Sequence, residues 1–247
     1  MRARLLAFAA AGAATLLAGA AAPIVISPIA ATPIGFAPQH VNHAAHAHTV
    51  GGTFNQDGGN WSGWVSTGSG FSSVSASWNE PTVTCNSSND LYAPWVGIDG
   101  YGSQSVEQTG VATDCSSGSP QYQAWYEMYP DSPVYYNDTV QAGDNFTGSV
   151  KRSGTSYTLT ITDNTQGWTE HVTKSYNGQN SSAEFILESP SGAYPDFGTV
   201  SFSGATVDGA TYTGRNGVAL DASNNSGFED RTGALSNGSF DVSYVQE

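Results

Sequence analysis

The chain has 247 residues, is 38% hydrophobic and only 11% charged, and carries a formal net charge of −14 at pH 7. This acidity excludes binding to nucleic acid by charge, because phosphate backbones attract basic surfaces. The length is sufficient for one sizeable domain with a core of its own.

The first residues have the pattern of a secretory signal peptide. Two arginines precede an apolar, alanine-rich run that ends in small residues suitable for cleavage, MRARLLAFAAAGAATLLAGAAAP. We therefore expect residues 1–22 to be removed and the protein to be secreted to the extracellular space. No later stretch is apolar for long enough to span a membrane, so we expect no membrane association after the signal is removed.

Residues 23–52 have the composition of a propeptide or linker. They contain four prolines and four histidines but no Asp, Glu, Lys or Arg. The histidines become charged below about pH 6. Three interpretations stay open: protonation changes the attraction of this segment to the acidic domain, the tract chelates a metal, or it has no role. The four residues are His40, His43, His46 and His48.

Residues 53–247 are predicted to form the single folded domain. It holds all 21 acidic residues and five basic ones, a formal net charge of −16. Because amines are few, acidification neutralises carboxylates without building up a large positive charge, which favours stability in acid. An acidic composition is also common among secreted proteins, so it does not by itself establish acid activity.

From Asn60 onward the chain is a succession of short runs rich in Val, Tyr, Thr, Ser and Trp, separated by Gly, Asn, Asp and Pro. This pattern predicts an all-β domain. Most runs alternate apolar and polar residues, which indicates sheets with one buried face. At this length we expect a double-sheet sandwich.

Two cysteines, Cys85 and Cys115, lie in a chain that is expected to be exported. We predict a disulfide between them that fixes the loop region carrying Gln108. A closed loop of about 30 residues contributes on the order of 3 to 4 kcal/mol in the loop-entropy description. Two thiols without a close histidine are too few ligands for a metal site, and no cofactor is expected.

Two runs are expected to place carboxylates on aromatic strand faces. In AEFILE, period-two alternation puts Glu184 and Glu188 on one face. In AWYEMYP it puts Trp125 and Glu127 on one face. We expect the two faces to meet across a concave sheet, where burial beside Trp raises the pKa of a carboxyl.

The familiar hydrolase arrangements are absent from residues 53–247. Their only histidine, His171, lies on a polar run that is predicted to be an exposed strand, and there is no HExxH, Asp-Thr-Gly or Asp-Ser-Gly sequence. The most suitable pair is Gln108 and Glu188. A carboxylate can deprotonate water, and a side-chain amide can hold the oxyanion formed when that water attacks a peptide carbonyl.

Six motifs together resemble the eqolisins, the pepstatin-insensitive glutamic peptidases. They occur in family order and span nearly the whole domain: NWSGWV, WVGIDG, EQTGV, AWYEMYP, AEFILE and DFGTVSFSGA. The resemblance implies a concanavalin-like β-sandwich of two bent antiparallel sheets. It also implies a secreted endopeptidase that is made as an acid-activated precursor and acts on proteins or peptides.

The resemblance implies that Gln108 and Glu188 are the catalytic dyad, with Glu188 as general base and then acid, and Gln108 as oxyanion stabiliser. The remaining motif residues are expected to line the cleft or to support the dyad. They are Trp61, Trp95, Asp99, Trp125 and Glu127. The sequence departs from the fungal pattern at Gln123, which replaces an acid, and at Ser189-Pro190, which replaces Asp-Phe. These departures affect the expected subsites and the proton network around the base.

Two other interpretations remain at this point. A carbohydrate-active or carbohydrate-binding β-sandwich would use Glu127 and Glu188 as its carboxylate pair. A non-catalytic surface protein would use neither. We expect a monomer.

Overall fold

The computed structural model describes residues 55–247. The predicted signal peptide (1–22), the predicted propeptide (23–52) with its histidines, and the first two residues of the predicted domain lie outside the described residues. Residues 55–247 contain no helix that is long and apolar enough to cross a membrane. Their regular structure consists of strands, as the composition predicts.

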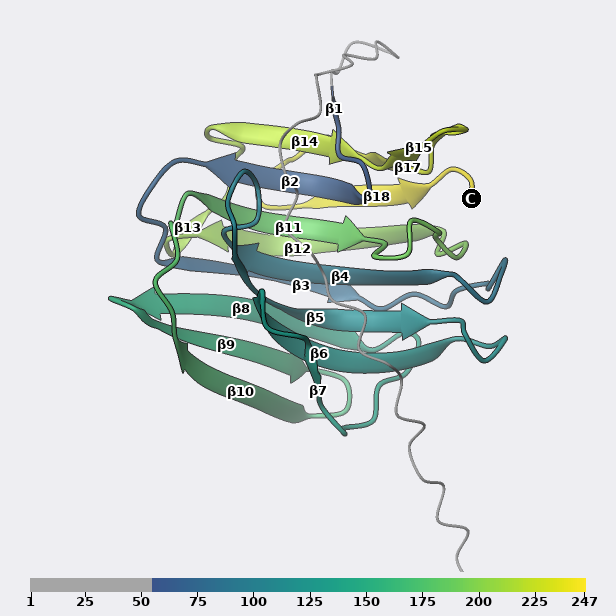
Figure 1. Ribbon diagram of the computed structural model, residues 1–247, viewed down its shortest axis with the longest axis horizontal. Helices are drawn as coiled ribbons and strands as arrows, with labels where there is room; N and C mark the ends of the chain where they lie inside the picture. The colour runs from purple at the N-terminus through teal and green to yellow at the C-terminus, as the bar shows by residue number, and fades with distance from the viewer. Residues whose placement is uncertain (1–54) are drawn as a thin grey trace, which may run out of the picture. The chain divides into compact units, whose positions relative to one another are not determined.

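The first sheet has eight strands in the order β1-β14-β2-β11-β4-β5-β6-β7 (Figure 1). The β1–β14 pair is parallel and the other pairs are antiparallel. In this order the strands are β1 (Gln56–Asp57), β14 (Gly217–Asp221), β2 (Trp61–Thr67), β11 (Ser182–Glu188), β4 (Leu91–Ile98), β5 (Val106–Asp114), β6 (Gln121–Tyr129) and β7 (Val134–Tyr135).

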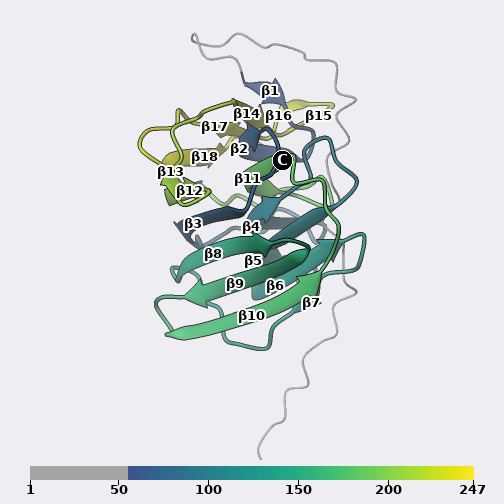
Figure 2. The same cartoon turned by 90° about the vertical axis from the view of Figure 1, so that its left-hand side faces the viewer.

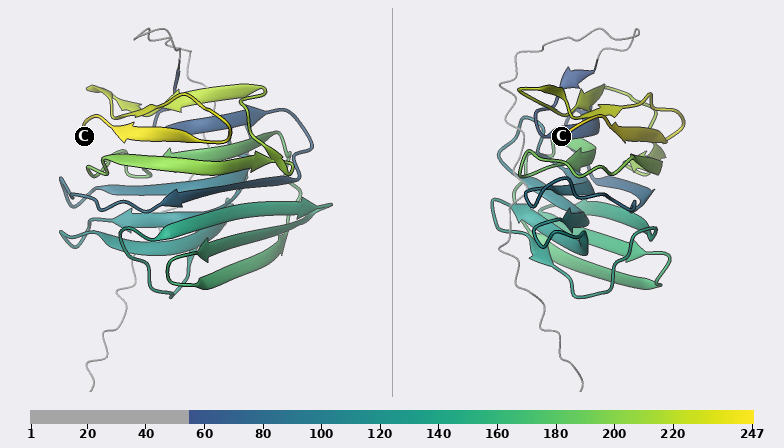
Figure 3. Two further views of the ribbon diagram at one scale, coloured as in Figure 1. Left: turned by 180° about the vertical axis from the view of Figure 1, so that it is seen from behind. Right: turned by 90° about the vertical axis from the view of Figure 1, so that its right-hand side faces the viewer.

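The second sheet is antiparallel, with the order β10-β9-β8-β3-β12-β18-β17, and a short β13 pairs with β12. It lies behind the first sheet in Figure 1 and in front in the left panel of Figure 3. Its strands are β10 (Trp168–Ser175), β9 (Ser156–Asp163), β8 (Asn145–Ser153), β3 (Ser73–Asn79), β12 (Thr199–Val207), β13 (Ala210–Thr211), β18 (Phe240–Tyr244) and β17 (Asp230–Thr232). A separate hairpin joins β15 (Ser223–Asn224) to β16 (Gly227–Phe228).

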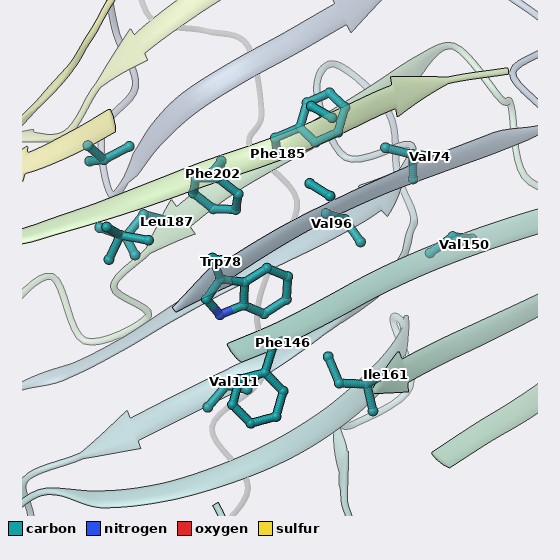
Figure 4. Packing of buried hydrophobic residues seen from close by; sticks show 14 of the residues in the cluster. Val74, Trp78, Val96, Val111, Phe146, Val150, Ile161, Phe185, Leu187 and Phe202 are labelled. Atoms are coloured by element: carbon teal, nitrogen blue, oxygen red, sulfur yellow. The ribbon is translucent and has the colours of Figure 1, made fainter. Parts of the chain in front are cut away.

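The two sheets stack face to face and form an all-β sandwich, so the predicted fold class is confirmed (Figure 2). Inward side chains from both sheets form one core, which includes Trp78, Phe146, Phe185 and Phe202 (Figure 4). Burial of each large apolar side chain contributes about 1.5 to 3 kcal/mol before conformational entropy is subtracted. Period-two alternation therefore decides which side chains enter this core.

A second apolar cluster lies on the opposite face of the first sheet. Its buried members all come from the strands of that sheet or from their ends, and none comes from the second sheet. They are Trp61, Val65, Ala93, Trp95, Val106, Ala112, Trp125, Ile186 and Leu220. We call this surface the outer face. Along β11, Phe185 and Leu187 enter the core between the sheets whereas Ile186 joins the outer face, as the alternation predicts.

The predicted disulfide between Cys85 and Cys115 is present, with a Cα–Cα distance of 5.7 Å. It ties the end of β5 to the segment between β3 and β4. The expectation that it fixes a loop carrying Gln108 is wrong, because Gln108 lies within β5 and is paired on both sides. Sheet hydrogen bonding, rather than the disulfide, fixes the backbone of Gln108.

Candidate active site

The carboxyl group of Glu188 lies at the end of β11 and receives two side-chain N–H groups. Trp95 Nε1 donates to Oε2 at 3.1 Å, and Asn60 Nδ2 donates to Oε1 at 3.3 Å. The Trp61 ring packs edge-on against Trp95, with ring centroids 4.9 Å apart. Glu188 is therefore held by groups from β2, β4 and the turn before β2.

Burial raises the pKa of Glu188 well above its ordinary value. The Trp61 side chain lowers this pKa, and the nearby Glu127 carboxyl raises it further. The N–H groups of Trp95 and Asn60 also lower it. Desolvation is the largest cause, so water admitted beside the carboxyl brings its pKa back down. The carboxyl is thus suited to exchange protons with a water molecule.

Gln108 lies directly opposite Glu127 across the β5–β6 pair. Gln108 Nε2 donates to Glu127 Oε2 at 2.7 Å, and both side chains are fully buried. This contact fixes the orientation of the carboxamide, because the group that donates must be the NH₂ side. Glu127 therefore contacts the amide directly, and its charge also raises the pKa of Glu188.

Trp95 lies between the two predicted dyad residues. Along β4, Glu188 is in register with Ala93 and Gln108 with Gly97, an offset of four residues or roughly 13 Å. The indole of Trp95 contacts both ends of this stretch: its Nε1 binds Glu188, while a Cβ on Gly97 would lie 2.8 Å from its Cζ3 and 3.2 Å from Gln108 Cβ. The indole therefore forms a floor between the carboxylate and the carboxamide.

The glycine of the QTG motif, Gly110, makes room for this floor. It is paired with Trp95 across β4 and β5, and a Cβ there would collide with the Pro94 carbonyl oxygen and lie 2.6 Å from Trp95 Cβ. A larger residue would displace Trp95. Trp125 is paired with the same glycine from β6 and extends the aromatic outer face.

Asp99 follows β4, where it adopts a φ of 64°. Its carboxylate accepts hydrogen bonds from the backbone N–H groups of Asn180 at 2.7 Å and Ser181 at 2.8 Å. These residues directly precede β11. Asp99 therefore anchors the start of β11, whereas Glu188 lies at the end of that strand.

Glu184, the other glutamate of AEFILE, is also buried, but it has a different partner. It accepts the backbone N–H of Tyr101 at 2.9 Å. Burial raises its pKa well above the ordinary value, and Asp99 and Glu107 raise it further. Its partner is thus a loop backbone, whereas Glu188 is held by the indole and amide side chains of the outer face.

His171 on β10 is exposed, as predicted. The two positions that depart from the fungal pattern both make hydrogen bonds to nearby backbone. Gln123 donates to the backbone oxygen of Tyr136 at 3.0 Å, so it holds the segment after β7. Ser189 accepts the Ala193 N–H at 2.9 Å and fixes the turn after β11. Both departures from the fungal pattern therefore have local structural roles.

Asn60 is the site residue that sequence reasoning missed. The motif NWSGWV contains it, but only Trp61 of that motif was expected at the site. The turn between β1 and β2 brings its amide to a carboxylate 128 positions later in the chain. One indication in the sequence that Asn60 belongs to the site was its position directly before Trp61 in the motif.

Three further buried carboxyls indicate how stability depends on pH. Burial is the main cause that raises the pKa of Glu80 to about 7, and those of Glu107 and Asp230 to about 8. Because the folded pKa exceeds the unfolded one, each group stabilises the fold fully below about pH 4. That contribution is lost as the pH rises toward 7 to 8.

We therefore expect the free energy of unfolding to fall between about pH 4 and pH 8, by several kcal/mol in total. Urea unfolding at a series of pH values measures this. Glu80→Gln is the matched variant, because an amide oxygen can still accept the hydrogen bonds of Tyr92 and Thr113. It should be less sensitive to rising pH than the wild type. Stability that increases from pH 4 to pH 8 would contradict this expectation.

The fold and the site together define a class: a β-sandwich hydrolase in which a carboxyl and a carboxamide group share one sheet face. Residues 59–244 match the peptidase A4 family. The chain is 30% identical to aspergillopepsin-2 of Aspergillus niger over 79% of this chain and 81% of that protein. It is 38% identical to scytalidopepsin B of Scytalidium lignicola over 52% and 51%, respectively.

Solved structures give the same result. Scytalido-glutamic peptidase with a transition state analog inhibitor aligns with a TM-score of 0.68 at 28% identity, covering 76% of this chain and 98% of that one. A member of the eqolisin family in complex with the tripeptide Ala-Ile-His aligns with a TM-score of 0.62 at 26% identity, with the same coverage. The chain belongs to the peptidase A4 family, the eqolisins. It is an enzyme of the glutamic peptidase type, and the carbohydrate-binding and non-catalytic interpretations lose their support.

Proposed function

We propose that this glutamic peptidase is a secreted, monomeric endopeptidase that cleaves proteins in acid and resists pepstatin, with Glu188 and Gln108 as its catalytic dyad. The observation that supports the dyad best is the set of contacts around Glu188. Two N–H groups orient its carboxylate on the same face that carries a carboxamide. Such an orientation leaves the carboxylate able to bind a water molecule.

The reaction follows from these groups. Glu188 removes a proton from water while the water oxygen bonds to the scissile carbonyl carbon, and the carbonyl oxygen becomes an oxyanion. An N–H of Gln108 donates to this oxyanion. The protonated Glu188 then gives its proton to the amide nitrogen, the C–N bond breaks, and a carboxylic acid and an amine leave.

The composition of the chain supports synthesis as a precursor. An apolar, alanine-rich run that follows two arginines has the pattern of a signal peptide, and the Pro- and His-rich segment after it has no Asp, Glu, Lys or Arg. We assign residues 1–22 to the signal peptide and residues 23–52 to the segment that is removed during activation.

The test is hydrolysis of a denatured protein by the secreted, matured enzyme between pH 2 and pH 7, with and without pepstatin. We expect cleavage that is strongest in acid and is unchanged by pepstatin. Cleavage products with new internal termini would establish an endopeptidase. Absence of cleavage by folded, matured protein would refute the proposed function.

A further inference from the structure

The amide nitrogen of Asn60 lies within hydrogen-bond distance of the base and of the residue that follows its strand. Nδ2 lies 3.3 Å from Glu188 Oε1 and 3.1 Å from the backbone oxygen of Ser189. A carboxamide nitrogen has two hydrogens, so it can serve both acceptors at once. Asn60 therefore connects the carboxylate of Glu188 to the backbone of the next residue.

The backbone of Asn60 is held at the same place. Its carbonyl oxygen accepts the Ser189 N–H at 3.0 Å and the Tyr194 hydroxyl at 2.6 Å. The turn before β2 and the turn after β11 are thus joined by four hydrogen bonds that involve one asparagine. A side chain fixed in this way has little conformational freedom to lose when it binds a charge.

We propose that Asn60 is a positioning residue for the reaction, which holds the Glu188 carboxylate in its ionised form and in one orientation. This inference rests on the proposed function. A hydrogen bond from a neutral amide favours the charged form of a carboxyl group, and here it acts on the oxygen that Trp95 leaves unbound. Each carboxylate oxygen thus accepts one side-chain N–H, Oε2 from Trp95 and Oε1 from Asn60.

Other titratable groups near Glu188 act against ionisation. The Glu127 carboxyl on β6 raises the pKa of Glu188, and the charge of Glu188 in turn raises the pKa of Tyr194 after β11. Neither of these groups can supply positive charge. The N–H groups of Asn60 and Trp95 therefore favour the ionised form of the buried base.

The test replaces Asn60 with Ala and with the similarly shaped Leu, which has no N–H. In both variants the acid limb of the kcat/KM profile should move up by about one pH unit, because the ionised base has lost a donor. Trp95→Phe removes the other donor and should move the limb in the same direction. Asn89→Leu is the control, because Asn89 is exposed and its backbone N–H binds Ser87, which is not a residue of the site.

A second readout does not depend on activity. Trp95 donates to Glu188, so ionisation of Glu188 should alter tryptophan fluorescence, and subtraction of the Glu188→Gln titration isolates that change. The midpoint should rise in Asn60→Ala and Asn60→Leu but not in Asn89→Leu. An unchanged midpoint in folded Asn60 variants would overturn the positioning role. A shifted midpoint in a protein whose wild type cleaves nothing would instead count against the proposed function.

Discussion

Glu188→Gln is expected to lower kcat at least about 10³-fold, because one residue supplies both the general base and the general acid. The glutamine side chain has nearly the same shape, and its carbonyl oxygen can still accept one of the two N–H groups of Asn60 and Trp95. The fold should therefore survive. The measurement is kcat and KM on a peptide substrate, with urea unfolding in parallel.

Glu184→Gln is the matched control on the same strand. Glu184 accepts a backbone N–H from Tyr101, and an amide oxygen can take over that role. Most activity should remain in this variant. If Glu184→Gln were inactive and Glu188→Gln active, the base would be the first glutamate of AEFILE, and our assignment would be wrong.

Gln108→Ala is expected to lower kcat by about 10² to 10³, the loss typical of removing one oxyanion donor. The substrate KM should change little, because the amide acts mainly on charge that develops in the transition state. The variant also leaves the Glu127 carboxyl without its 2.7 Å donor. Unfolding measurements must therefore confirm that the variant is folded.

Two further variants complete this test. Gln104→Ala changes an exposed glutamine near the start of β5 and should keep full activity. Glu127→Gln separates the peptidase from a two-carboxylate glycosidase. The peptidase should lose more activity with Gln108→Ala than with Glu127→Gln, and the reverse order would favour the glycosidase mechanism.

Much of the fold follows from local sequence. Alternation correctly assigned Phe185 and Leu187 to one face of β11 and Ile186 to the other, because successive strand side chains point to opposite faces. The disulfide was predictable because residues 53–247 contain only two cysteines. The placement of Gln108 in a loop was wrong, since a glycine-rich motif can also lie inside a strand when a large side chain packs over the glycine.

The site was only partly predictable. Motif order pointed to Gln108 and Glu188, but it gave neither their partners nor the distance between them. Asp99 was expected to line the cleft or to support the dyad, but the motif did not give its partner, the backbone that precedes β11. Asn60 was not expected at all, because an asparagine in a turn is ordinarily explained by backbone conformation.

The sequence by itself determined the all-β class, the strand faces, the disulfide pairing and the peptidase family, because these depend on residue type and short spacing. The tertiary structure alone decided that Trp95 and Asn60 share the Glu188 carboxylate and that Glu127 holds Gln108. These contacts join residues 93, 128 and 19 positions apart, respectively. They depend on strand register and on side-chain conformations that packing selects, and the pKa of the base depends on desolvation by the whole fold.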